Sequence, residues 1–377
     1  MGRKPRRETM GKRPELPALT GLRFFAALAI VIHHACGPFF SRATVADWPL
    51  DQGVSLFFVL SGFVLTYAYP ELPTAACVRA FFIARFARIW PAHIATLLLV
   101  GAAVVGWSIS GPLAANVLLV QAWIPQMSYY FSYNAVSWSI STEFGFYLLF
   151  PLLIRRFADR WHIVLAGSLA LLIGLIVLMP SDPAAHAFIY ISPLGRLFEF
   201  VLGMVAALLW MRAPTSALGV FCLSAAELAI VTLVLLQLRY GTPYLGALGG
   251  GQFPGVAEWA WHSGGCVGFA LAIVLFAQGK GIIARLLAVA PIAFLGRMSY
   301  SLYLLHQPAI SLWENYVGKY GAWWDAAFFV LLLGASIALF LTIEQPARRW
   351  IRRAYAASPG LRSTARAQLS TWRADPI

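Results

Sequence analysis

Two ionisable side chains, Arg23 and His34, lie in an otherwise apolar stretch near the N-terminus. A helix turns about 100° and rises about 1.5 Å per residue, so it places them within about 20° of one face and about 16 Å apart along its axis. An ionisable group costs at least about 2.5 kcal/mol at the centre of a membrane-spanning helix, so such groups mark functional sites. The alternative is that Arg23 reaches the headgroups and the adjacent His33 and His34 bond to a neighbouring helix. An arginine with two histidines on one span favours the functional interpretation.

Ionisable residues also interrupt later apolar stretches. Glu143 stands near the start of one of them, where an unpaired buried carboxylate is costly and must be neutral, paired or in contact with water. Arg196 and Glu199 are spaced i, i+3, which favours an internal salt bridge. His306 lies in a further apolar stretch. Helix geometry places these four residues and His34 in the outer halves of their spans, which predicts a polar chamber within the membrane.

Polar and aromatic residues near these groups are candidates to line the chamber. Ser61 lies in a span with several serines and glycines, where close helix packing explains the residue types as well as substrate contact does. The full set of chamber-lining candidates is Ser61, Trp138, Ser139, Arg196, Glu199, Tyr303 and His306.

The stretch from 79 to 91 alternates basic and aromatic residues at helical spacing. This pattern predicts an amphipathic helix with two interpretations of equal weight. The helix could lie on the membrane surface. It could instead form a cationic mouth, in which Arg85 and Arg88 bind a phosphate-bearing donor, because a guanidinium can bond two phosphate oxygens at once.

The composition is that of an integral membrane protein. Of the 377 residues, 60% are hydrophobic and 11% are charged, whereas soluble domains contain about 25% charged residues. The apolar residues extend along the whole chain, which predicts one all-α, polytopic membrane helix bundle with about ten transmembrane helices. The expected spans are 18–40, 51–69, 90–106, 136–154, 162–180, 191–210, 216–238, 260–278, 291–312 and 323–343. They divide the chain into a basic N-terminal segment (1–17), a transmembrane domain (18–346) and a basic tail (347–377).

The net charge of +13 follows this topology. Most of the 28 Lys and Arg residues fall into segments that share one side of the membrane, whereas the opposite loops contain Arg42, Arg239 and Lys319. The bias puts both termini in the cytoplasm. The same bias explains the positive net charge, so a nucleic-acid partner is not expected. The expected partner is the lipid bilayer. The first apolar run carries an arginine and two histidines, so we expect a retained span rather than a cleaved signal peptide.

The cysteines give no sign of a metal or of disulfides. Cys36, Cys77, Cys222 and Cys266 are scattered without paired spacing. Neither a zinc site nor a disulfide framework is expected from them, and we expect no metal.

Seven short elements, in the same order between residues 18 and 350, together resemble the acyltransferase 3 family of integral-membrane O-acyltransferases. His33 doubles the histidine of the first element, and the spacing favours His34. Thr142-Glu143-Phe144 replaces a more acidic local pattern common in the family. The elements are Arg-x10-His (Arg23, His34), Phe-Phe-x-x-Ser-Gly-Phe (57–63), Arg-x-x-Arg-Ile-x-Pro (85–91), Trp-Ser-x-Ser-x-Glu (138–143), Arg-x-x-Glu-Phe-x-x-Gly (196–203), Ser-Tyr-Ser-Leu-Tyr-Leu-Leu-His (299–306) and Glu-x-Pro (344–346).

The resemblance implies an enzyme that moves an acyl group, commonly acetyl from acetyl-CoA, onto a hydroxyl of a carbohydrate or a related acceptor. Family members modify surface polysaccharides, lipopolysaccharide, glycolipid signals and some macrolides. The implied acceptor is a cell-surface carbohydrate or glycolipid, and the implied location is the cytoplasmic (inner) membrane of a bacterium. No bound cofactor is expected, because acyl-CoA is the donor substrate.

The residues suit this chemistry. Acyl transfer to an alcohol needs a base near neutrality, and histidine is the side chain whose ordinary pKa lies there. His34 could deprotonate the acceptor hydroxyl, or carry the acyl group covalently. Arg23 could tune His34 or hold donor phosphate, and Glu143 could orient a histidine or bind acceptor hydroxyls. Arg23, His34 and Glu143 are therefore the catalytic candidates.

A second class of function fits the same residues. Transporters and flippases also bury Arg, Glu and His at mid-membrane, where these groups relay protons or bind a polar or lipid-linked substrate. Inverted repeats would favour transport, and the sequence shows none. An acylated product would identify the enzyme, whereas a transporter would move its substrate unchanged.

Overall fold

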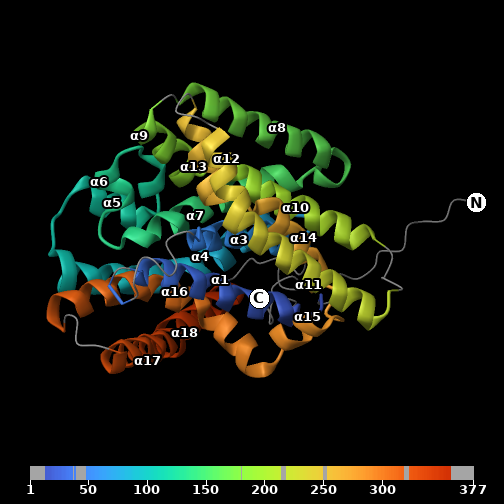
Figure 1. Ribbon diagram of the computed structural model, residues 1–377. Helices are drawn as coiled ribbons and strands as arrows, with labels where there is room; N and C mark the ends of the chain where they lie inside the picture. The colour runs from blue at the N-terminus through green and yellow to red at the C-terminus, as the bar shows by residue number, and fades with distance from the viewer. Residues whose placement is uncertain are drawn as a thin grey trace, which may run out of the picture.

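The computed structural model describes residues 13–36, 38–39, 48–179, 181–213, 218–248, 253–317 and 322–357. Within these ranges the regular structure is helical, with no strand, which confirms the all-α prediction. The helices form one bundle, with α3 in its middle, α8 along one edge and α17 along the opposite edge (Figure 1).

The helices vary widely in length. The long ones are α1 (Pro17–Ala35), α3 (Gly53–Ala68), α4 (Ala75–Val100), α7 (Trp138–Ile154), α8 (Phe157–Leu178), α10 (Leu197–Arg212), α11 (Val220–Leu236), α13 (Pro254–Ser263), α14 (Cys266–Phe276), α16 (Ala290–Tyr316), α17 (Ala322–Leu339) and α18 (Gln345–Ala356). The short ones are η1 (Leu50–Gln52), η2 (Gly101–Val105), α5 (Gly111–Leu118), η3 (Gln121–Trp123), α6 (Met127–Tyr130), η4 (Ala135–Ser137), α9 (Asp182–Ala185), η5 (His186–Ile191), η6 (Gln237–Gly241), α12 (Thr242–Leu248), α15 (Ile282–Leu287) and η7 (Phe340–Glu344).

Eight helical segments in the described part of the chain are long and apolar enough to span a membrane. They coincide with eight of the ten expected spans, while α10 and α16 occupy the expected spans 191–210 and 291–312. The polytopic bundle is thereby confirmed, and the side that each terminus faces stays a prediction. Residues 1–12 and 358–377 of the two expected terminal segments lie outside the described residues, as do Arg42 and Lys319. The eight segments are 17–35, 50–68, 75–105, 135–154, 157–178, 220–248, 254–276 and 323–356.

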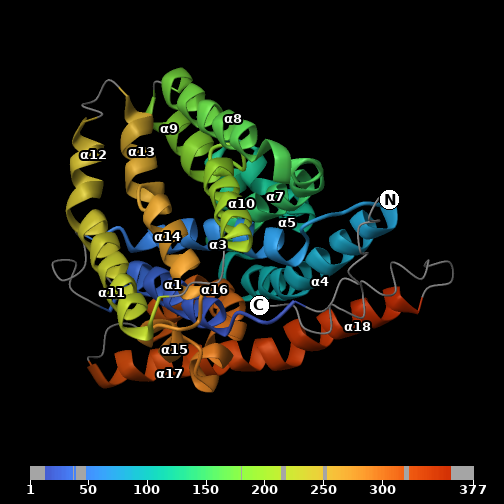
Figure 2. The ribbon, with the colours of Figure 1, turned by 90° about the vertical axis from the view of Figure 1, so that its right-hand side faces the viewer.

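Several spans extend beyond their expected limits, two of them by more than ten residues. The third begins at Ala75 rather than at 90, after Thr74, whose hydroxyl accepts a hydrogen bond from the Cys77 amide as a helix N-cap. The basic and aromatic stretch 79–91 is therefore the first half of α4 and not a separate helix. Its position relative to the membrane surface stays a prediction. The last span runs from α17 through η7 into α18, and the three elements form one continuous rod along the lower edge of Figure 2.

The centre of the bundle is a close crossing of α3 and α10. The apolar α3 is buried along almost its whole length. A side chain at Gly62 would place its Cβ 1.9 Å from the backbone oxygen of Phe200, and one at Gly203 would place it 1.9 Å from that of Val59. The two glycines thus allow backbone contact between the helices, as small residues do in membrane bundles. Gly62 therefore serves close helix packing, which was one of the two interpretations of the serines and glycines in this span, the other being substrate contact.

The packing of α1 against α16 brings together residues that are far apart in the sequence. The two helices lie side by side, and a Cβ at Gly296 of α16 would lie 1.8 Å from the backbone oxygen of Thr20. At its other end this contact places His34 beside His306. The position of both histidines therefore depends on the close approach of α1 and α16.

We expect Gly203→Ala to lower the stability of the bundle by about 1–3 kcal/mol or more, because the added methyl group must push two backbones apart. Gly174→Ala is the matched control, since this glycine of α8 has open space around it, and alanine favours a helix by about 1 kcal/mol. Thermal unfolding in detergent, followed by intrinsic fluorescence, measures both changes. Equal effects of the two substitutions would contradict the close α3–α10 contact.

Candidate active site

His34 and His306 form a hydrogen-bonded pair between α1 and α16. The Nδ1–H of His306 donates to the Tyr303 carbonyl at 2.5 Å, which leaves a lone pair on its Nε2. That Nε2 lies 3.2 Å from His34 Nδ1, and His34 Nδ1 also donates to the Ile30 carbonyl at 3.0 Å. With these partners the proton of His34 is assigned to Nδ1. Nε2 of His34 is then left as the basic nitrogen, and no described residue bonds to it.

Nearby residues enclose a pocket of about 620 Å³ beside His34, which we call the histidine pocket. Trp138 and Tyr190 pack together in its wall, with ring centroids 4.7 Å apart. His33 does not line this pocket and is exposed. The pocket therefore combines one basic nitrogen with aromatic surface and a few polar groups. Its lining is Ile30, His34, Asp51, Val54, Phe131, Ala135, Val136, Trp138, Tyr190, Tyr303 and Gln307.

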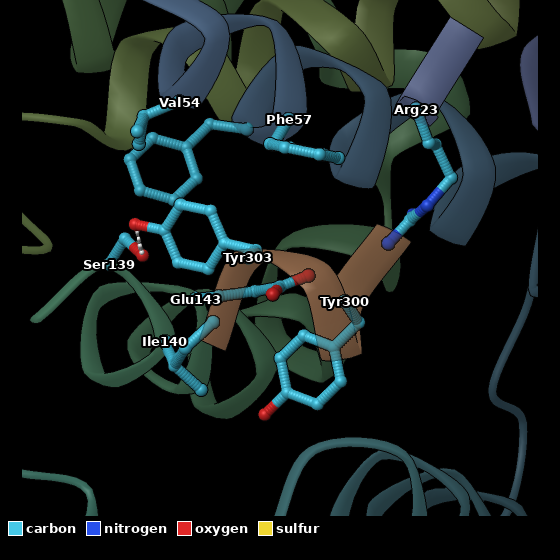
Figure 3. A pocket seen from close by; sticks show the side chains of 9 residues that line it. Arg23, Val54, Phe57, Ser139, Ile140, Glu143, Tyr300 and Tyr303 are labelled. Carbon is cyan, nitrogen blue, oxygen red and sulfur yellow. Dashed lines mark hydrogen bonds between the residues drawn. The ribbon is translucent and has the colours of Figure 1, made fainter. Parts of the chain in front are cut away.

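A second pocket, of about 420 Å³, adjoins the first and is called the central pocket; Figure 3 shows it from close by. The Arg23 side chain points from α1 toward the Glu143 carboxylate of α7. The Arg23 guanidinium lies 5.3 Å from the centre of the Phe57 ring. Its Nε is buried and has no hydrogen-bond partner among the described residues. Ser139 and Tyr303 are joined by a hydrogen bond of 2.7 Å in the opposite wall.

Glu143 is held by hydroxyl groups and not by a histidine. Its Oε1 accepts hydrogen bonds from Ser61 at 3.0 Å and from Tyr147 at 2.7 Å. Glu143 is also absent from the lining of the histidine pocket. This corrects the expectation that Glu143 could orient a histidine, because His306 has that position beside His34.

The third pocket, of about 420 Å³, is rich in arginine and is called the arginine pocket. Arg85 donates to the Tyr69 hydroxyl at 3.2 Å and lies over the Tyr69 ring at 5.5 Å. Arg88 forms a buried ion pair with Glu344 of η7. The lining is Arg23, Ser61, Val64, Leu65, Arg85, Arg88, Ile89, Glu143, Tyr147 and Tyr300.

Two arginines of α18 add to this positive charge. The helix packs against α4. Arg348 and Arg352 lie close enough to Arg85 and Arg88 to repel them electrostatically. Sequence reasoning assigned both to the basic tail. A signal was present, because Glu344, Arg348 and Arg352 follow one another at four-residue spacing and must share a helix face.

The three pockets form a series, because neighbouring pockets share lining residues. Val54 and Tyr303 border both the histidine pocket and the central pocket. Arg23, Glu143 and Tyr300 border both the central pocket and the arginine pocket. The series places a cluster of cations at one end and a basic nitrogen at the other.

Arg196 and Glu199 were expected to line the chamber, but they lie outside the three pockets. Their side chains form the predicted i, i+3 salt bridge, with 3.1 Å between Arg196 Nη2 and Glu199 Oε2, and both are buried. The Arg196 guanidinium lies 5.2 Å from the Phe58 ring. Neither residue lines any of the three pockets. His306 likewise lies behind His34 and not in the pocket lining. Of the other candidates, Ser61, Trp138, Ser139 and Tyr303 each line at least one pocket.

The chain is similar in sequence to known proteins. Residues 16–343 match a family described as an acyltransferase domain. The chain is 30% identical over 391 aligned residues to Acyltransferase MdmB of Streptomyces mycarofaciens, with 91% of this chain and 95% of that relative covered. It is 27% identical to O-acetyltransferase OatA of Staphylococcus aureus strain NCTC 8325, with 82% of this chain and 53% of that relative covered. The chain thus spans about half the length of OatA. No solved structure matches it.

We expect Arg88→Met to destabilise the protein by about 3–5 kcal/mol, because it leaves the buried Glu344 carboxylate without its cation. The double variant Arg88→Met with Glu344→Met should recover much of that loss, since no buried charge is then left unpaired. Arg79→Met, at an exposed position of the same helix, is the control and should change stability little. Chemical unfolding in detergent measures the wild type, these three variants and the single variant Glu344→Met. Additive losses in the double variant would show that the two side chains do not interact.

Proposed function

The chain belongs to the acyltransferase family that matches residues 16–343, and from this premise we propose that it transfers an acetyl group from acetyl-CoA to a hydroxyl of a carbohydrate or glycolipid. The observation that carries the proposal is the series of pockets from the arginine cluster to His34. A donor that is anionic at one end and reactive at the other fits such a series. A protein that only binds a neutral lipid would need neither the arginine cluster nor the basic nitrogen of His34.

The arginine pocket suits the phosphate-bearing end of coenzyme A. Guanidinium groups bond phosphate oxygens in pairs, and Arg85 is already held in place by Tyr69. Arg88 is neutralised by Glu344, so we assign it to holding the pocket together more than to binding. The slender pantetheine arm would then pass Arg23 and Phe57 in the central pocket and bring its thioester to the histidine pocket. Arg23 Nε, buried without a partner, is a donor available to that arm.

The histidine pocket suits a sugar. Aromatic faces of Trp138 and Tyr190 can cover the apolar side of a sugar ring, while Asp51 and Gln307 can bond its hydroxyls. In the reaction, His34 Nε2 accepts the proton of the acceptor hydroxyl while the oxygen attacks the thioester carbonyl. The carbon–sulfur bond breaks, the thiolate leaves, and the proton on His34 neutralises it. His306 accepts the Nδ1–H of His34 throughout and keeps Nε2 turned to the pocket, as the third member of a catalytic triad does.

The expected topology gives this transfer a direction. With both termini in the cytoplasm, the arginine pocket opens toward the cytosolic donor and the histidine pocket toward the far side. The location we propose is the cytoplasmic membrane of a bacterium. The relatives support a bacterial multi-pass membrane protein.

We expect His34→Ala to reduce acetyl transfer to background, because a methyl group cannot accept a proton. His33→Ala is the matched control: the neighbouring side chain is exposed and should leave activity within a few-fold of normal. His306→Phe should lower kcat by about 100-fold with little change in the acceptor KM, since it removes the partner that orients His34. The assay is release of free thiol from acetyl-CoA by protein in liposomes with a sugar acceptor. Normal turnover by His34→Ala, or no thiol release by the wild type with any hydroxyl acceptor, would overturn the proposal.

A second experiment tests the donor site. Arg85→Gln and Arg352→Gln should each raise the KM for acetyl-CoA about tenfold, the loss expected when a charge-assisted bond to phosphate is removed, while the acceptor KM stays unchanged. Arg79→Gln, an exposed position of α4, is the control. Equal changes in both KM values would place the donor elsewhere.

A further inference from the structure

A cluster of histidine and carboxylate side chains lies beside the histidine pocket and takes no part in the reaction above. Glu258 and His262 are one turn apart on α13, which packs against η5. His186 begins η5. Their nitrogen and oxygen atoms lie within 4.8 Å of one another. The three side chains keep between 21% and 29% of their surface exposed, so they are not sealed inside the bundle.

The spacing of these atoms suits a small metal ion. His186 Nδ1 lies 3.5 Å from Glu258 Oε1, and His262 Nε2 lies 3.2 Å from Glu258 Oε2. Bonds of about 2.1 Å around a tetrahedral Zn²⁺ place neighbouring ligand atoms about 3.4 Å apart. Two imidazoles with one carboxylate form a ligand set that zinc takes in proteins, with a fourth position open.

The hydrogen bond of His262 with Asp51 decides which of its ring nitrogens faces Glu258. His262 Nδ1 donates to the carboxylate of Asp51, so neutral His262 has its lone pair on Nε2. That lone pair faces Glu258 Oε2, which is buried and makes no aligned hydrogen bond. Two electron-rich atoms this close repel unless a proton or a cation lies between them. The contact of His262 with Asp51 is also the outer partner that metal-binding histidines usually have.

The charge of the cluster points the same way. Asp51 and Glu258 together carry two negative charges. The neighbouring cation, Arg196, donates to the His262 carbonyl at 3.2 Å, but its charge is matched by Glu199. A divalent cation bound by two neutral histidines would balance the two carboxylates.

We propose that His186, Glu258 and His262 bind a divalent transition metal of the zinc type, and that Asp51 orients His262 toward it. Cysteine spacing gives no sign of this site, because its ligands are histidine and glutamate side chains that the contact of α13 with η5 brings together. The site would stiffen the wall of the histidine pocket. Tyr190 stacks on His262 with ring centroids 3.7 Å apart, and both Tyr190 and Asp51 line that pocket.

The test measures metal alone and needs no activity. The full chain, purified without a histidine tag and stripped with a chelator, is incubated with Zn²⁺ and separated from free metal, and bound zinc is measured by mass spectrometry. We expect about one zinc per chain for the wild type and less than a tenth for His186→Ala and for Glu258→Gln. His162→Ala, an exposed histidine of α8, is the control and should bind as the wild type does. Zn²⁺ should also raise the melting temperature of the wild type but not that of Glu258→Gln.

Two results would overturn the proposal. The first is a wild type that binds no stoichiometric zinc, in which case a proton on His262 joins the two carboxylates. The second is equal binding by Glu258→Gln and the wild type, which would place the metal elsewhere. If His186→Ala fails to fold, His186→Gln tests the same ligand with a side chain of similar length. Loss of acetyl transfer is not an outcome of this experiment, so its failure leaves the proposed function unaffected.

Discussion

The buried ion pair of Arg88 with Glu344 determines where the arginine pocket lies. Charges in apolar surroundings are stable only when they are matched and their remaining atoms are bonded. Glu344 meets this condition, because it accepts from Arg88 of α4 and, at 2.7 Å, from Ser301 of α16. Three segments are thereby fixed to one another: α4, α16 and η7. Since α18 continues directly from η7, the same contact places Arg348 and Arg352 against Arg85.

The same principle separates the two kinds of buried charge in this protein. Arg196 and Glu199 pair with each other and lie outside the pockets, so their charge stabilises the bundle locally. Arg23 differs in its position, because it borders the central pocket and the arginine pocket, and its Nε has no partner among the described residues. A buried donor without an acceptor costs about 1–3 kcal/mol. Arg196 also has buried nitrogens without a partner among the described residues, but it lines none of the three pockets. A ligand in the pockets can therefore reach Arg23 and not Arg196, which is the reason to propose the donor substrate at Arg23.

Sequence reasoning predicted where the apolar helices lie and named several residues that line the pockets. Apolar runs of about twenty residues are local signals, so ten spans could be placed, and an arginine or histidine within such a run stands out by itself. The partners could not be found in this way. His34 and His306 are separated by 272 positions, and Arg88 and Glu344 by 256, so their contacts depend on how α1, α4 and η7 pack. The extent of α4 was also missed, because Arg85 and Arg88 resemble surface residues until Glu344 and Tyr69 are brought to them. The crossing of α3 and α10 depends on Gly62 and Gly203 together, so it could not be predicted from the sequence of either helix alone.

The length of the pocket series suits the chemistry proposed for it. Arg23, which borders the arginine pocket, and His34 share one face of α1 and are about 16 Å apart along its axis. In the proposed reaction the phosphates of the donor and its thioester therefore lie in different pockets. Between them the path is bordered by Phe57, Tyr300 and Tyr303, which leave little room for water beside a narrow chain. Exclusion of water protects a thioester from hydrolysis and strengthens each polar contact made to it. A catalytic base in the arginine pocket would lie beside the phosphates of the donor and away from the acceptor hydroxyl. His34 lies instead in the histidine pocket, beside His306 and the aromatic wall, where the proposed thioester and an acceptor hydroxyl can come together.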